Sequence, residues 1–244
     1  MLKENKILKL LAKKGFQVKN VLPVPKQKTK VCRIELDNHS SAILKIWPFY
    51  PLRFIKVRFN KNWVADYRWK CSMPFNEFRI NHLLRKNSKI ITPDIFLFER
   101  IFPFKSIRYG YLMLQEDLSL KNYEDSEDLL KRLIAQKEYK TIFLFMEKVA
   151  QILQDLFNIG IYNEDAQLKN FLVNDRFEFA LIDFERFFEC KDDQKKSDYR
   201  DQVISCLVKN YKKITSGDSN FSSGLEPLFR LKPPKFQDMP KGKF

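Results

Sequence analysis

The clearest pattern in the chain is a helical repeat over residues 141–157, and two short apolar runs follow it. Apolar side chains recur at steps of three and four along the repeat: Ile142, Phe145, Met146, Val149, Ile152, Leu153 and Leu156. Gly160 is placed to end this helix. The runs FLV (171–173) and FALI (179–182) then predict a pair of strands with a turn near Asn174 and Asp175. The chain therefore has to pack a long amphipathic helix with a small β-hairpin.

Three polar residues flank the predicted hairpin. Asp165 and Asn170 precede its first strand, and Asp183 follows its second strand. Because these two ends of a hairpin meet, the three side chains are expected to converge on one edge of the small sheet. Carboxylate and amide oxygens are the ligands that Mg²⁺ prefers, and a nearby carboxylate can accept the proton of an attacking hydroxyl. The pattern predicts metal-assisted phosphoryl transfer.

The rest of the chain predicts strands in the first half and helices in the second. The expected helices cover 1–15, 77–87 and 198–211, and the expected strands cover 31–36, 42–47, 95–102 and 109–115. We expect an α+β fold of two lobes. A small β-rich lobe would span residues 1–116, and a mostly helical lobe would span residues 117–244.

Asp165 and Asn170, followed by a strand and then by Asp183-Phe184, resemble the catalytic loop and the metal-binding aspartate of the protein-kinase-like fold. The resemblance implies that Asp165 is the catalytic base and that Asn170 and Asp183 hold Mg²⁺. The structural alternative is that both aspartates are caps or turn residues.

The same resemblance implies an ATP site in the first lobe. Lys45, in the strand AILKIW, matches the lysine that contacts the α- and β-phosphates, and Glu77 at the start of the next helix is its expected partner. Gln115 and Glu116 lie where a backbone hinge for adenine is expected. The alternatives are a lysine on the wet face of a sheet and a glutamate favoured by the first turn of a helix.

Several residues depart from the protein-kinase pattern. Asn163 and Glu164 replace the histidine and the arginine of the catalytic loop, and Gln167 replaces its lysine, although Lys169 is near. No glycine lies between residues 15 and 110, so KQKTKVCRIEL would have to cover the nucleotide without a glycine-rich loop. Lys28, Thr29 and Lys30 are the candidates for this contact. These departures argue against a regulated protein kinase and leave a pseudokinase open.

The ending IDFER, followed by a basic stretch and DYRDQVISCL, is similar to the small bacterial lipopolysaccharide-core kinases, which phosphorylate Kdo or heptose. The element PDIF (93–96) also fits them, and the resemblance covers about residues 25–210. It implies an ATP-dependent sugar kinase that acts on the lipopolysaccharide inner core at the cytoplasmic membrane face.

The net charge of +15 implies a polyanionic partner. We expect residues 53–70 and the lysines of the tail to dock on an anionic glycolipid, although a solvated basic loop explains them equally well. No apolar run approaches the about 20 residues of a membrane span, and the four scattered cysteines do not suggest zinc. The expected location is cytoplasmic, with peripheral contact at the inner face of the cell membrane.

Two rival functions remain open. One is another small-molecule kinase of the choline or aminoglycoside type, because IDFE also occurs in that group. The other is a non-catalytic, basic kinase-like module that binds a membrane or nucleic acid, the latter being the less favoured partner.

Overall fold

The computed structural model describes residues 4–23, 30–37, 40–48, 63–101 and 110–231. They form two compact units, the first from residues 1–78 and 93–121 and the second from residues 79–92 and 122–244. The prediction of an α+β fold, with an antiparallel sheet in the N-terminal part and a mostly helical later part, is confirmed. Within the described residues, no helix combines the length and the apolar composition needed to cross a membrane.

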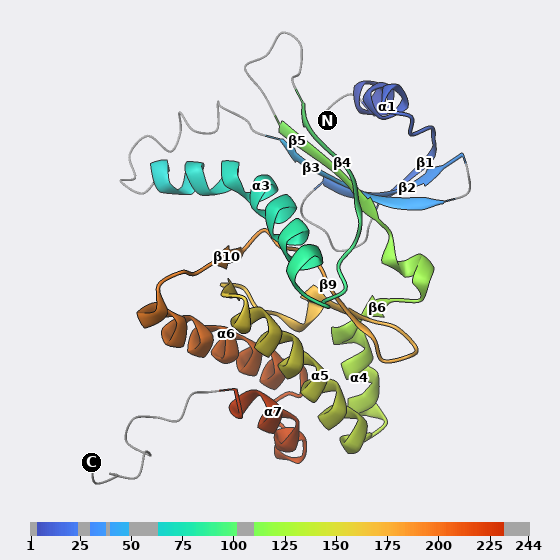
Figure 1. Ribbon diagram of the computed structural model, residues 1–244. Helices are drawn as coiled ribbons and strands as arrows, with labels where there is room; N and C mark the ends of the chain where they lie inside the picture. The colour runs from blue at the N-terminus through green and yellow to red at the C-terminus, as the bar shows by residue number, and fades with distance from the viewer. Residues whose placement is uncertain (1–3, 24–29, 38–39, 49–62, 102–109, 232–244) are drawn as a thin grey trace. The chain divides into compact units, whose positions relative to one another are not determined.

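An antiparallel five-stranded sheet forms the centre of the first unit (Figure 1). Its strand order is β1-β2-β3-β5-β4, with bounds β1 Val18–Pro23, β2 Lys30–Leu36, β3 Ser41–Pro48, β4 Ile95–Ile101 and β5 Gly110–Glu116. Helix α1 (Glu4–Lys13) packs on it through Ile7 and Leu11, which are buried with the apolar side chains of β2, β3 and β5. Burial of this apolar stripe explains why the short basic helix forms.

Helix α1 ends as the sequence predicts. Gly15 adopts the left-handed conformation, with φ at 89°, and the N–H of Phe16 donates to the carbonyl of Leu11. Glycine suits this position because it has no Cβ to clash there.

Helix α3 (Trp63–Asn87) begins earlier than the predicted helix over residues 77–87. Pro74 lies inside it and is buried. Proline lacks an N–H donor and ordinarily marks a helix boundary, so the sequence gives little sign that the helix continues through it. The prediction that Glu77 opens the helix is therefore wrong, because Glu77 lies in its interior.

The second unit is mostly helical and contains two small sheets (Figure 1). Its helices are α4 Ser126–Ala135, α5 Tyr139–Asn158, α6 Asp193–Ile214 and α7 Glu226–Phe229, with 3-10 turns η2 Leu168–Asn170 and η3 Ser219–Leu225; η1 Leu118–Lys121 belongs to the first unit. The sheets have the orders β6-β8-β9 and β10-β7, with bounds β6 Glu124–Asp125, β7 Ile161–Asn163, β8 Phe171–Val173, β9 Phe179–Leu181 and β10 Phe187–Glu189.

Helix α5 supplies much of the second unit's core. Every residue of its predicted apolar repeat is buried or packs against the core, and Gly160 follows with φ at 74°. Helices α4 and α7 both pack against α5. The second half of α3 contributes Ile80 and Leu84 to the same core. The predicted helix and hairpin thus form one packed body, which positions the loop between them.

Candidate functional site

The loop from Asp165 to Asn170 connects β7 to β8 in the second unit. Asn163, at the end of β7, is buried, and its side-chain oxygen accepts a 2.9 Å hydrogen bond from the N–H of Asp165. An asparagine that bonds the backbone two residues ahead forms a tight local turn. Asn163 therefore shapes the start of this loop.

Asn170 closes the same loop from its other end. Its Nδ2 donates to the carbonyl oxygen of Asp165 at 3.2 Å, and its backbone N–H donates to Gln167 at 3.1 Å. The Asn170 side chain is buried. The loop is thus cross-linked at both ends, and the conformation around Asp165 is fixed by short-range hydrogen bonds.

Two residues from neighbouring helices hold the middle of the loop. The side-chain oxygen of Asn210 on α6 accepts a 2.8 Å hydrogen bond from the N–H of Leu168. The hydroxyl of Ser126 on α4 donates to the carbonyl oxygen of Leu168 at 2.6 Å. Because buried polar backbone groups need partners, Asn210 and Ser126 support the loop directly. The sequence gives no local signal for either residue, since both contacts span 42 positions.

Asp183 follows directly after β9 and Ile182. The N–H of Ile182 donates to the carbonyl oxygen of Asn170 at 2.9 Å, and Phe171 pairs with Leu181 across the hairpin. These contacts make Asn170 and Ile182, the residue before Asp183, backbone neighbours at one end of the hairpin. The convergence of the Asp165, Asn170 and Asp183 side chains stays a prediction.

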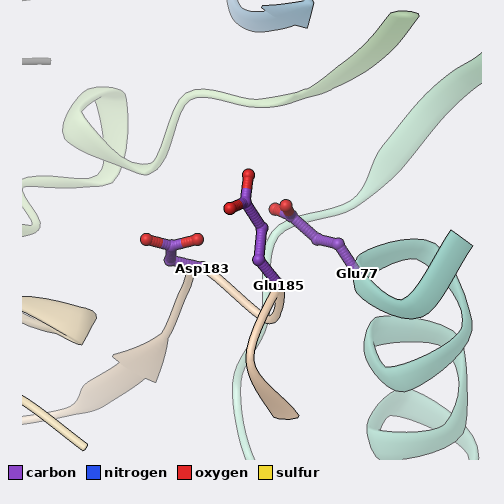
Figure 2. Close-up of side chains that lie close together, drawn as sticks. All are labelled: Glu77, Asp183 and Glu185. Atoms are coloured by element: carbon purple, nitrogen blue, oxygen red, sulfur yellow. The ribbon is translucent and has the colours of Figure 1, made fainter. Parts of the chain in front are cut away.

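The backbone of Asp183 is in an uncommon conformation. Its φ is 63°, in the left-handed region, and its side chain is exposed. Residues held there cost conformational energy and gather at functional sites. One carboxylate oxygen of Asp183 and one of Glu185 lie within 4.8 Å of each other (Figure 2). Two carboxylate groups thus lie close together on the segment after β9.

The carboxylate of Asp165 contacts two side chains. Nε2 of Gln167 donates to Oδ1 at 2.5 Å, and Nε of Arg186 lies 3.8 Å from Oδ2. Both the Asp165 and the Arg186 side chains are partly exposed. The sequence assigns no role to Arg186, which is 21 positions away from Asp165 (186 − 165 = 21).

Lys45 and Glu77 belong to the first unit, and they form an ion pair there. Lys45 lies in β3 opposite Val31 and Met113, and its side chain is only 12% exposed. Glu77 projects from α3 (Figure 2) and is 1% exposed. Burying a charged carboxylate without a partner costs free energy, so the ion pair with Lys45 allows Glu77 to be buried. The predicted pairing of these two residues is present, whereas their contact with nucleotide stays a prediction.

Gln115 and Glu116 end strand β5. Gln115 is buried, and the N–H of Glu116 donates to the carbonyl oxygen of Asp94 at 2.7 Å. The Glu116 carboxylate accepts from the N–H of Asp94 at 3.2 Å and pairs with Lys121 at 2.5 Å. The segment is therefore tied to the start of β4. Its recognition of adenine stays a prediction.

A polar network that the sequence did not reveal surrounds the next residue, Asp117, which is 3% exposed. Its carboxylate accepts from the Ser41 hydroxyl at 2.5 Å and the Ser119 hydroxyl at 2.7 Å, and it pairs with Arg33 at 2.6 Å. Burial raises the pKa of Asp117, but these hydrogen bonds and the Arg33 charge outweigh burial and lower the pKa below its usual value. The network joins β2, β3 and η1 at the end of β5.

Other predicted residues are outside the described part of the chain. Lys28 and Thr29 lie there, together with residues 53–62 of the basic segment and the lysines of the tail. Residues 63–70 belong to α3. Their predicted contacts with nucleotide or glycolipid stay predictions.

The chain matches none of the protein-family models and none of the curated proteins with which it was compared.

Proposed function

We propose that the protein is an ATP- and Mg²⁺-dependent kinase that phosphorylates a sugar hydroxyl of an anionic glycolipid, as the lipopolysaccharide-core kinases do with Kdo or heptose. The observation that carries this proposal is the 2.9 Å hydrogen bond from Ile182 to Asn170. It ties Asp183 to the loop of Asp165 and Asn170, so that a carboxylate base and two oxygen ligands come from one end of one hairpin. A two-lobed kinase-like fold is part of the proposal.

The residues present fit a magnesium ion by their chemistry. Nδ2 of Asn170 bonds the carbonyl oxygen of Asp165, which leaves Oδ1 as the atom of that amide that can serve as a ligand. Asp183 adds an exposed carboxylate. Hard oxygen donors of this kind suit Mg²⁺, which would neutralise charge on the phosphates of the nucleotide.

The proposed roles of the chain's own residues follow from charge and proton balance. Asp165 would hold the acceptor hydroxyl in line with the γ-phosphorus and take its proton. The hydroxyl oxygen forms a bond to the γ-phosphorus while the bond to the β–γ bridging oxygen breaks, and ADP leaves with that electron pair. Lys45, held by Glu77, would bind the α- and β-phosphates.

The charge of the chain favours an anionic acceptor. The chain has 45 Lys and Arg against 30 Asp and Glu, and this net charge of +15 attracts phosphorylated glycolipids and repels cations. Choline and aminoglycosides are cationic, so the same field disfavours them as acceptors.

Two measurements on the full chain test the proposal in sequence. The melting temperature should rise with ATP only when Mg²⁺ is present, because a ligand that binds the folded state stabilises it. Phosphate from ATP should then appear on Kdo- or heptose-containing lipid, and not on choline or an aminoglycoside. Absence of any nucleotide effect at saturating ATP would refute the kinase proposal, and transfer to choline alone would refute the acceptor.

A further inference from the structure

The proposed reaction brings two anions to one hydroxyl group. The Asp165 carboxylate would accept the proton of that hydroxyl, and the γ-phosphate would accept its oxygen. Like charges this close repel each other, and the repulsion is strong where water is excluded. A cation beside Asp165 would offset it. This line of reasoning rests on the proposed function.

Arg186 is the cation that faces Asp165 within the described residues. Its Nε lies 3.8 Å from Oδ2 of Asp165, while Oδ1 accepts from the neutral amide of Gln167. Lys169, which the sequence offers as a candidate, is exposed on η2 and forms no ion pair in the described part of the chain. Arg186 therefore places a positive charge next to Asp165, whereas Gln167, at the position of the catalytic-loop lysine in the protein-kinase pattern, is neutral.

Backbone hydrogen bonds hold residue 186 near Asp165. Strand β10 pairs with β7 so that Phe187 lies opposite Asn163. The N–H of Glu164 donates to the carbonyl oxygen of Arg186 at 3.2 Å, and Phe187 is buried with a 3.2 Å turn bond to Phe184. These contacts place the Arg186 backbone beside the residues that precede Asp165.

We propose that Arg186 binds the γ-phosphate of ATP, and that it does so while facing the carboxylate of Asp165. A guanidinium has five N–H donors in a plane and can contact a carboxylate and a phosphate together, which the point charge of a lysine does less well. Arg186 would then distinguish ATP from ADP, because only ATP carries the phosphate that it contacts.

Calorimetric binding of a non-hydrolysable ATP analogue and of ADP, each with Mg²⁺, tests the assignment without any turnover. Arg186→Gln should weaken the ATP analogue about tenfold or more and leave ADP unchanged, since charge-assisted hydrogen bonds are worth that much. The affinity of Arg186→Lys for the ATP analogue should lie between that of Arg186→Gln and that of the unchanged protein. Arg176→Gln is the matched control, because it removes an exposed arginine from the turn between β8 and β9, and it should change the affinity for neither ligand.

The possible outcomes separate this assignment from the proposed function. Arg186→Gln could weaken the binding of the ATP analogue and of ADP equally, or leave both unchanged. Either result would show that Arg186 does not bind the γ-phosphate even though the protein binds nucleotide. If the unchanged protein binds neither ligand, the proposed function fails and the Arg186 assignment fails with it. Should Arg186→Gln not fold, Arg186→Lys decides: a lower preference for the ATP analogue supports the assignment, and an unchanged preference overturns it.

Discussion

The backbone N–H of Ile182 donates a hydrogen bond of 2.9 Å to the carbonyl oxygen of Asn170. This bond joins the end of β9, next to Asp183, to the end of the loop that begins at Asp165. Because it uses backbone atoms, a change of the Asn170 side chain leaves the bond itself in place. The side-chain roles of Asn170 and Asp183 can therefore be tested without breaking the hairpin.

Asn170→Ala removes the Nδ2 donor to Asp165 and the proposed oxygen ligand together. We expect the Mg²⁺ concentration needed for nucleotide binding to rise about tenfold or more, and the stability to fall by about 1 kcal/mol for the lost hydrogen bond. A Mg²⁺ titration at fixed nucleotide measures the first effect. Asn158→Ala, at the exposed end of α5, is the control. An unchanged Mg²⁺ requirement in Asn170→Ala would argue against Asn170 as a ligand.

The Lys45–Glu77 ion pair should show strong coupling in a double-mutant cycle. Lys45→Met leaves the Glu77 carboxylate buried without this partner, and loss of one member of a buried pair costs about 3–5 kcal/mol. Lys45→Met with Glu77→Leu should recover much of that loss, because no charge is then buried. Chemical denaturation measures the cycle. Strictly additive effects would mean that the pair contributes nothing as a pair.

Asp117 should contribute to the loss of stability at acid pH, and this effect can be measured without any assay of catalysis. Its folded pKa lies below the ordinary 3.8, so its contribution to stability is complete above that value. The contribution is lost as the pH falls from 3.8 through the lower folded pKa. Asp117→Asn should cost about 1–3 kcal/mol at neutral pH and flatten the stability profile below pH 3.8.

Thermal unfolding across the acid range tests this prediction. Asp128→Asn, an exposed residue on α4, is the matched control and should leave both the melting temperature and its pH dependence nearly unchanged. An acid profile for Asp117→Asn that equals that of the unchanged protein would contradict the prediction.

Tyr211 should make the second unit sensitive to alkali. Burial raises the pKa of Tyr211 from 10.0 to about 12, and its hydroxyl donates to the carbonyl oxygen of Phe221 at 2.8 Å. The folded state thus favours the neutral phenol, so the contribution of Tyr211 is complete below pH 10.0 and is lost as the pH rises toward about 12.

A Tyr211→Phe variant isolates this effect. It should lose about 1 kcal/mol at neutral pH, because the Phe221 carbonyl loses a partner. Its stability should then decline less steeply than that of the unchanged protein between pH 10 and 12. Parallel alkaline profiles for the two proteins would show that Tyr211 ionises as freely in the folded state as in the unfolded state.

The helices and strands that have a clear apolar pattern of their own could be predicted from the sequence. The three- and four-residue repeat of 141–157 indicated α5 to within two residues, and the short apolar runs indicated β8 and β9. The pairing of Lys45 with Glu77 was expected from the resemblance to the protein-kinase-like fold and not from a local pattern, and the pair is present although Glu77 lies inside α3 rather than at its start.

Features set by distant contacts were beyond the same reasoning. Helix α3 continues through Pro74, and its start at Trp63 therefore has no local signal. Strands β7 and β10 have three residues each and exist because they pair with each other. The position of Arg186 beside Asp165 depends on that pairing, as the Asp117 network depends on the meeting of β2, β3 and β5. The polar side chains of the candidate site were predictable, whereas the residues that hold and accompany them were not.

The most direct test of the central claim compares Asp165→Asn with Glu164→Gln in transfer of phosphate from ATP to the glycolipid acceptor. Glu164 is the adjacent, exposed acid and serves as the matched control. Asp165→Asn keeps the size of the side chain and removes the base, so we expect transfer to fall about a hundredfold to ten-thousandfold while nucleotide binding and melting temperature are retained. Glu164→Gln should transfer phosphate at nearly the unchanged rate. Full transfer by Asp165→Asn would contradict the account.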